Sequence, residues 1–129
     1  MCAATIISAR FVLTVAHCVQ KHQLSPLMVR VGDWDLKATR EMFPSYDVQV
    51  SRVIVHQEFY AGDLHNDIAM LELKHPLDFS LMPHVGTICL PPNSKPIYSD
   101  CLVTGWGQSA PTGEVRHLSI FLSNPIIFF

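Results

Sequence analysis

Charged residues are scarce and scattered in this sequence. They account for 16% of its 129 residues, the net charge is −2, and the lysines and arginines form no run along the chain. Proteins that bind nucleic acids normally carry a basic patch, so nucleic acid is not an expected partner. No stretch of about eighteen consecutive apolar residues occurs either, so no membrane-spanning helix is predicted.

Metal and redox motifs are also missing. The four cysteines, Cys2, Cys18, Cys89 and Cys101, include no C-x-x-C pair, and the seven histidines include no H-E-x-x-H pattern. A zinc site or a thioredoxin-type redox site is therefore not indicated, and we expect no metal and no cofactor. Four cysteines allow three complete pairings, and their spacing alone does not choose among them.

The amino-terminal residues lack the signature of a signal peptide. The stretch from Met1 to Ala16 has no positively charged start, and Arg10 interrupts its apolar run. We therefore predict no signal peptide in this chain.

Apolar residues are abundant, at 49%, and the chain is long enough for one domain with a sizeable core. They fall in short β-type runs separated by turn-forming clusters, which indicates an all-β sandwich or barrel. Within residues 46–56, the alternation at Val48 and Val50 slips in phase before it resumes at Val53 and Val55. One helical turn is expected at His17–Val19. The predicted strand runs are 4–8, 10–16, 27–34, 46–56, 67–73 and 101–106.

Most histidines and both tryptophans have a purely structural interpretation. Trp34 is expected to be half-buried at a strand end, and Trp106 to pack at a barrel corner beside its flanking glycines. The histidines other than His17 lie in polar or proline-adjacent contexts and are expected at the surface; they are His22, His56, His65, His75, His84 and His117.

His17 and Asp67 are the two candidate catalytic residues. His17 lies between a small apolar residue and a cysteine, directly after an apolar run. On its own this context also fits a core histidine satisfied by backbone groups, or a metal ligand. Asp67 precedes the apolar run 68–71, where its strand can hold a partly buried carboxylate in place. Such a carboxylate can accept a hydrogen bond from one ring nitrogen of a histidine and fix its tautomer.

Four motifs carry a resemblance to the trypsin- and chymotrypsin-like serine proteases. They are "LTVAHC" at 13–18, "NDIAMLEL" at 66–73, "ICLPP" at 88–92 and "CLVTGWG" at 101–107, in the family's order and approximate spacing. The stretch "VRVGDWD" further resembles arthropod blood proteases and their inactive homologues. The resemblance implies an incomplete chymotrypsin-like double β-barrel, with most of the first barrel and the opening strand of the second.

The resemblance also implies roles for individual residues. His17 matches the family's general base and Asp67 the carboxylate that orients it. Cys2 and Cys18 match the disulfide that brackets the histidine strand. In the family, the cysteines at the positions of Cys89 and Cys101 bond to residues outside the span present here, so we expect both to lack those partners.

The resemblance divides the chain into three parts. Residues 1–88 are expected to form a partial amino-terminal trypsin-like β-barrel, and residues 89–107 the inter-barrel link with the first strand of the second barrel. Composition changes after Gly107, so residues 108–129 are expected to be a divergent tail.

The family's nucleophile motif, Gly-Asp-Ser-Gly-Gly, is absent. None of the ten serines has glycine both two positions before and two positions after it, and Ser109 is the nearest case. The oxyanion hole and specificity pocket around that nucleophile are missing with it. The expected function is therefore a fragment of a secreted, extracellular trypsin-like serine endopeptidase that is inactive alone. The full-length relative would act on a protein or peptide substrate.

The alternative is a non-catalytic serine protease homologue that works as a binding adaptor or decoy. A first barrel without its second would expose an apolar face, which is a possible site for a protein partner.

Overall fold

The computed structural model describes residues 2–22, 27–35, 40–90, 101–103 and 120–122. Its contacts divide the chain into two compact units. One is formed by Cys2 and Ala4–Ile88, and the other by Met1, Ala3 and Cys89–Phe129. Each unit is described by itself.

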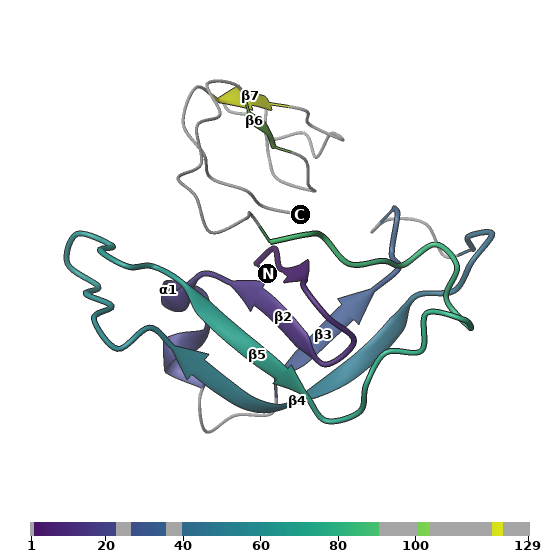
Figure 1. Cartoon of the computed structure of the whole chain (residues 1–129), viewed down its shortest axis with the longest axis horizontal. Helices are drawn as coiled ribbons and strands as arrows, with labels where there is room; N and C mark the ends of the chain where they lie inside the picture. The colour runs from purple at the N-terminus through teal and green to yellow at the C-terminus, as the bar shows by residue number, and fades with distance from the viewer. Residues whose placement is uncertain (1, 23–26, 36–39, 91–100, 104–119, 123–129) are drawn as a thin grey trace. The chain divides into compact units, whose positions relative to one another are not determined.

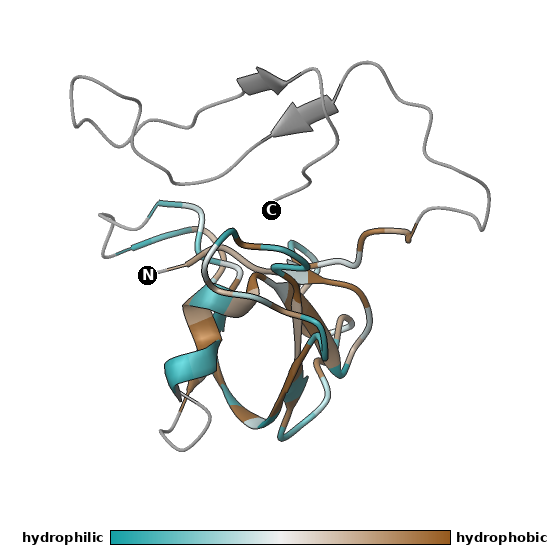
Figure 2. Ribbon diagram, turned by 90° about the vertical axis from the view of Figure 1, so that its left-hand side faces the viewer, coloured by the Kyte–Doolittle hydropathy of each residue, from teal (hydrophilic) through white to brown (hydrophobic). Residues whose placement is uncertain are grey.

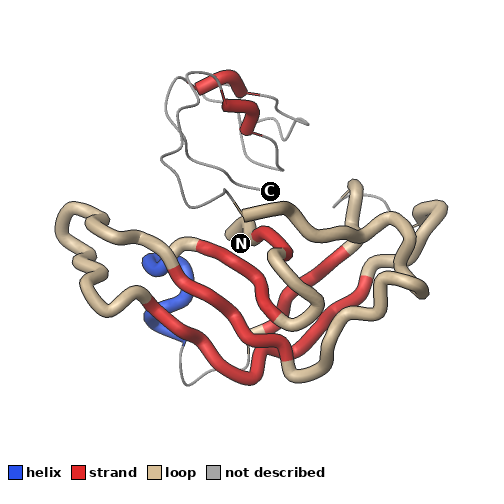
Figure 3. The backbone as a smooth tube through the Cα atoms, in the orientation of Figure 1, coloured by secondary structure: helices blue, strands red, loops and turns tan. Residues whose placement is uncertain are grey.

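The larger unit is a five-stranded antiparallel sheet that curls into a half-barrel (Figure 1). The strand order is β1-β2-β5-β4-β3. Helix is confined to the short segments α1 (Ala16–Val19) and η1 (Gln20–His22) within the described residues (Figure 3). The all-β prediction is confirmed, as is the resemblance to part of a chymotrypsin-like barrel. The strands are β1 (Thr5–Ile6), β2 (Phe11–Thr14), β3 (Met28–Val31), β4 (Tyr46–Val55) and β5 (Ala69–Leu73).

The smaller unit contains one described strand pair, β6 (Cys101–Val103) with β7 (Ile120–Leu122). The pair is antiparallel, and Leu102 lies opposite Phe121. β6 begins where the sequence predicts a strand over 101–106, and β7 lies in the segment expected to be a divergent tail. Trp106 and His117 lie outside the described residues.

The buried apolar residues of the larger unit form one core cluster, and hydrophobic residues occur along its strands (Figure 2). Buried and less buried positions alternate along β2, β3 and β5, as period-two patterning requires. Each fully buried Val or Leu side chain contributes about 1.5–3 kcal/mol relative to exposure. The buried apolar residues are Val12, Ala16, Val19, Val29, Val31, Ala69, Leu71, Leu73, Leu77 and Met82.

A β-bulge in β4 explains the phase slip seen in the sequence. Val50 lies opposite Leu73, but Arg52, two residues later, lies opposite Glu72, which is only one residue away. Ser51 is the extra residue, and its hydroxyl donates to the Glu72 carbonyl at 3.0 Å. The bulge keeps the valines on both sides of it facing the core, so one strand bends without losing its apolar face.

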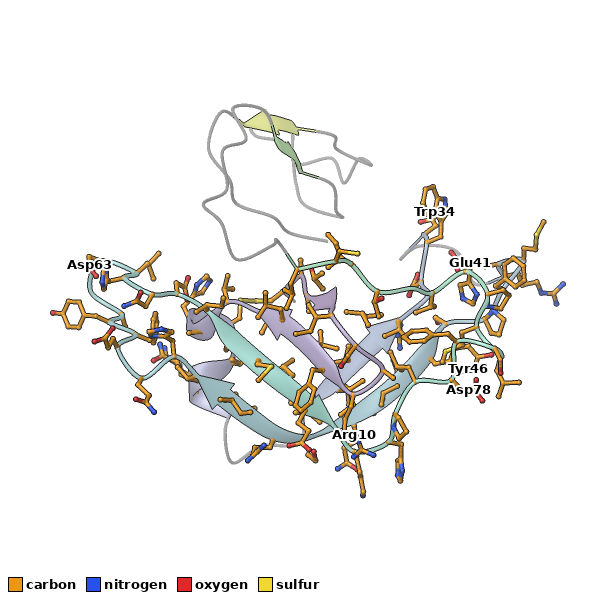
Figure 4. The ribbon with its side chains drawn as sticks, in the orientation of Figure 1. Arg10, Trp34, Glu41, Tyr46, Asp63 and Asp78 are labelled. Atoms are coloured by element: carbon orange, nitrogen blue, oxygen red, sulfur yellow. A yellow bond between two sulfur atoms is a disulfide. The ribbon has the colours of Figure 1, made fainter. Side chains whose placement is uncertain are left out.

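Two predicted environments are wrong. Trp34 was expected to be half-buried, but its residue is 70% exposed, and Figure 4 shows it projecting away from the sheet. His84 was expected at the surface, but both of its ring nitrogens are buried without a hydrogen-bond partner. The ring stacks on Phe43, with centroids 4.9 Å apart, and packs against Gly32. Tertiary contacts decide both positions: Trp34 is exposed between two aspartates, whereas the His84 ring packs against Phe43 and Gly32, which are distant from it in the sequence.

The remaining histidines with described side chains behave as predicted. His56, His65 and His75 are exposed. No helix in the described part of the chain is long and apolar enough to cross a membrane.

Candidate active site

Strand pairing brings His17 and Asp67 together. Thr14 at the end of β2 lies opposite Ala69 at the start of β5, so the residues just beyond each strand end share one edge of the sheet. After Val15 the chain turns into α1, whose buried Ala16 and Val19 anchor the helix on the core. His17 lies between them, with its side chain 49% exposed.

Asp67 contacts His17 at two points. Its Oδ2 lies 2.6 Å from the ring Nδ1, and its Oδ1 accepts the backbone N–H of His17 at 2.8 Å. A carboxylate can only accept here, so Nδ1 carries the proton in this contact. The carboxylate therefore sets both the orientation of the ring and the tautomer in which Nε2 is free to take a proton.

The turn before Asp67 is held by its own contacts. Asn66 adopts a left-handed backbone conformation, with φ 53°, which asparagine tolerates better than most residues. Its side-chain amide donates to the Glu58 carbonyl at 3.2 Å, and its own carbonyl accepts the Ile68 N–H at 2.7 Å. These bonds fix the position from which the Asp67 side chain reaches His17.

The electrostatics of the pair favour an ionised carboxylate. Burial, the largest single influence, pushes the pKa of Asp67 up, because the Asp67 side chain is only 16% exposed. Hydrogen bonds from the His17 ring and from the backbone N–H groups of His17 and Ala16 act in the opposite direction, with the charge of His17. Together they leave the pKa of Asp67 below its usual range.

A disulfide lies beside this pair. Cys2 and Cys18 are bonded, with their Cα atoms 6.4 Å apart, which ties the amino-terminal segment to α1. Cys18 Sγ lies 3.5 Å from His17 Nε2, a contact that the sequence signals only through the adjacency of the two residues. Cys89 is exposed and is not in a disulfide, while the side chain of Cys101 lies outside the described residues.

Other chemistries find little support in the geometry. Among the described residues, no three His, Cys, Asp or Glu side chains come together in a way that could hold a metal ion. The arrangement that does exist is a carboxylate bonded to an imidazole whose side chain is half-exposed, so Nε2 can accept a proton from a hydroxyl or from water.

Comparison with known proteins identifies the family. The sequence model of the trypsin family matches residues 1–123. The chain belongs to the trypsin family. The resemblance seen in the four motifs is thereby confirmed, and the match continues beyond Gly107, so it is longer than the motifs alone indicated.

Individual relatives of this trypsin-family chain come from insects. Phenoloxidase-activating factor 2 of Galleria mellonella is 37% identical over 115 residues, which cover 88% of the chain and 37% of the relative. The inactive CLIP domain-containing serine protease A28 of Anopheles gambiae is 35% identical over 128 residues, covering 98% of the chain and 32% of the relative. Serine proteinase stubble of Drosophila melanogaster is 32% identical over 127 residues, covering 98% of the chain and 16% of the relative. The trypsin-family chain spans about a third or less of each.

Proposed function

We propose that this chain is the general-base half of a secreted trypsin-like serine endopeptidase. His17 is the general base, and Asp67 orients it and stabilises the imidazolium that forms during the reaction. The observation that carries the proposal is the two-point contact of Asp67 with the ring and the backbone of His17. The contact places the proton on Nδ1 and leaves Nε2 to accept a proton, which is what a general base needs.

In this proposal the chain is divided as the motifs divide it. Residues 1–88 form most of the first barrel, residues 89–107 link to and open the second, and residues 108–129 are the tail, of which the family model still matches residues 108–123. The nucleophile is not among the 129 residues, since none of their serines has the family's motif. Losing the nucleophile of a serine protease costs about 2 × 10⁶ in turnover, so this chain alone is not expected to hydrolyse peptides.

The substrate class and location belong to the same proposal. Trypsin-family enzymes cleave peptide bonds in proteins or peptides, so the substrate of the full-length protein is a polypeptide. The Cys2–Cys18 disulfide supports an extracellular location, because such bonds form and persist in oxidising compartments.

A second candidate function is binding without catalysis. Relatives of both kinds match this chain, and the Anopheles relative is described as inactive. In that case His17 and Asp67 would persist as parts of the fold, and the barrel would act as an adaptor or decoy for another protein.

An experiment on the full-length product distinguishes the two functions. A full-length cDNA is sequenced through the end of the reading frame, and the protein that it encodes is treated with a serine-directed organophosphonate. The endopeptidase proposal expects a Gly-Asp-Ser-Gly-Gly segment and labelling at its serine, lost in His17→Ala. In trypsin-type triads, replacing the aspartate by asparagine lowers turnover about 10⁴-fold, so Asp67→Asn is expected to do the same. A full-length product without that serine would support the binding function instead.

The 129-residue chain supplies the negative control. It is expected to take up no organophosphonate, because the reagent needs an activated hydroxyl and oxyanion donors. Labelling of this chain at one serine, abolished by His17→Ala, would contradict the proposal.

A further inference from the structure

Cys18, His17 and Asp67 form a line of three reactive groups. Asp67 holds the Nδ1 side of the His17 ring, and Cys18 Sγ lies 3.5 Å from Nε2 on the other side. A carboxylate, an imidazole and a sulfur in this order are the parts of an activated cysteine. In the disulfide state the sulfur is bonded to Cys2 and has no thiolate to offer.

We propose that reduction of the Cys2–Cys18 disulfide creates a nucleophilic thiol site, in which the Cys18 thiolate pairs with the His17 imidazolium and reacts with disulfides and small electrophiles. The site requires only the contacts among these side chains. It therefore does not depend on whether the full-length protein is a protease.

The exposure of the two cysteines determines which sulfur a reductant attacks first. Cys2 is exposed, whereas Cys18 is half-buried at the base of α1. The thiolate of a dithiol reductant attacks Cys2 Sγ, a new S–S bond forms there, and the Cys2–Cys18 bond breaks. The electron pair leaves on Cys18 Sγ, where His17 stabilises it, and a better-stabilised leaving thiolate departs faster.

The second step completes the redox balance. The remaining thiol of the reductant attacks its own sulfur in the mixed disulfide and expels Cys2 as a thiolate, which then takes up a proton. The dithiol becomes a cyclic disulfide, while Cys2 and Cys18 together gain two electrons and two protons. The proton on the Cys18 side resides on His17 Nε2.

The backbone keeps the site assembled after reduction. Ala16 and Val19, on either side of His17 and Cys18, are buried in the core and hold this segment against it. Asp67 still holds the ring from β5. The titratable group that contacts the sulfur is His17, with Asp67 on the far side of its ring, and Lys21 further along the helical segment is exposed.

The first test uses the unaltered chain. The protein is exposed to limiting glutathione, quenched in acid, and mapped by peptide mass spectrometry. Glutathione is expected on Cys2, with Cys18 recovered as the free thiol. Glutathione found mainly on Cys18, or equally on both, would overturn the proposal.

The second test measures the reactivity of each thiol. Cys2→Ser leaves Cys18 free, and Cys18→Ser leaves Cys2 free as the matched control; iodoacetamide alkylation at each position is followed from pH 4 to pH 9. An ordinary cysteine thiol has a pKa of about 8.5, and pairing with a histidine lowers that pKa by roughly two units. After allowing for the weaker nucleophilicity of such a thiolate, Cys18 is expected to react about tenfold faster than Cys2 at pH 6.

The variant His17→Ala tests whether His17 is the cause of the raised Cys18 reactivity. Added to Cys2→Ser, it is expected to return the Cys18 profile to that of Cys2, while circular dichroism checks that the fold persists. A Cys18 profile that matches Cys2 from the start, or one that His17→Ala leaves unchanged, would refute the proposal. If the variants do not fold, the glutathione mapping on the unaltered chain still decides the result.

Discussion

The Asp67 carboxylate binds His17 through the side chain and the backbone at once, although the two residues lie 50 positions apart in the sequence. The backbone contact fixes where α1 begins relative to β5, and the side-chain contact fixes the ring. One aspartate thus couples the stability of the site to its chemistry. Removing its charge is expected to affect both.

Asp67→Asn is expected to alter the acid dependence of stability. Because the pKa of Asp67 is lowered in the folded state, its ionised form stabilises the protein above about pH 4, the ordinary value for an unfolded aspartate. That contribution is lost as the pH falls through the lower folded pKa. Urea unfolding should therefore show a free-energy difference between parent and variant at pH 7 that narrows below about pH 4. A difference that stays constant from pH 7 to pH 2 would contradict the assigned interaction.

Removing the disulfide is expected to destabilise the larger unit. Cys2 and Cys18 close a loop with a sequence separation of 16, and a loop of this size contributes about 3 kcal/mol in the chain-entropy model. Cys2→Ser should lower the free energy of unfolding by that amount, as measured by denaturant unfolding. Cys89→Ser is the matched control, since Cys89 is exposed and unbonded, and should change it by less than about 0.5 kcal/mol. Non-reducing peptide maps that link Cys2 to Cys89 or Cys101 would contradict the pairing.

Gly32→Ala is expected to be strongly destabilising, whereas Gly86→Ala is not. Gly32 has φ +75°, and a Cβ there would collide with His84 Nε2, while a Cβ at Gly86 meets nothing within 4 Å. Left-handed backbone strain and overpacking together cost about 2–4 kcal/mol. Thermal unfolding measures both variants. Adding His84→Ala to Gly32→Ala should recover the part due to the collision but not the part due to backbone strain. Equal effects at the two glycines would contradict both the left-handed backbone at Gly32 and the packing of His84 against it.

Leu73→Ala tests the core of the half-barrel. Leu73 is fully buried at the end of β5, and truncation of a buried leucine to alanine costs about 2–5 kcal/mol. Leu81→Ala is the matched control, because Leu81 is 72% exposed, and it should change stability by less than about 0.5 kcal/mol. Denaturant unfolding compares the two. Similar losses for both would mean that the sheet does not bury the face assigned to it.

Much of the fold could be predicted because local sequence patterns indicate where the strands lie. Alternation of apolar residues marked the strands, and the phase slip between Val50 and Val53 corresponds to the bulge at Ser51. The family motifs singled out His17 and Asp67 and the bond between Cys2 and Cys18. These features depend on residues close together in the chain, or on whole motifs whose order is visible in it.

The sequence by itself thus determined where the strands of the larger unit form and which two residues are candidates for catalysis, but it did not predict β7. Only the tertiary structure decided how they meet. The pairing of Thr14 with Ala69 sets the distance between His17 and Asp67, and the fold of α1 places the sulfur of Cys18 beside Nε2. The tertiary structure likewise decided that the ring nitrogens of His84 are buried and that Trp34 is exposed. The reason is physical: periodicity reports the side of a strand, whereas contacts between distant residues depend on strand register and on the packing of neighbouring loops.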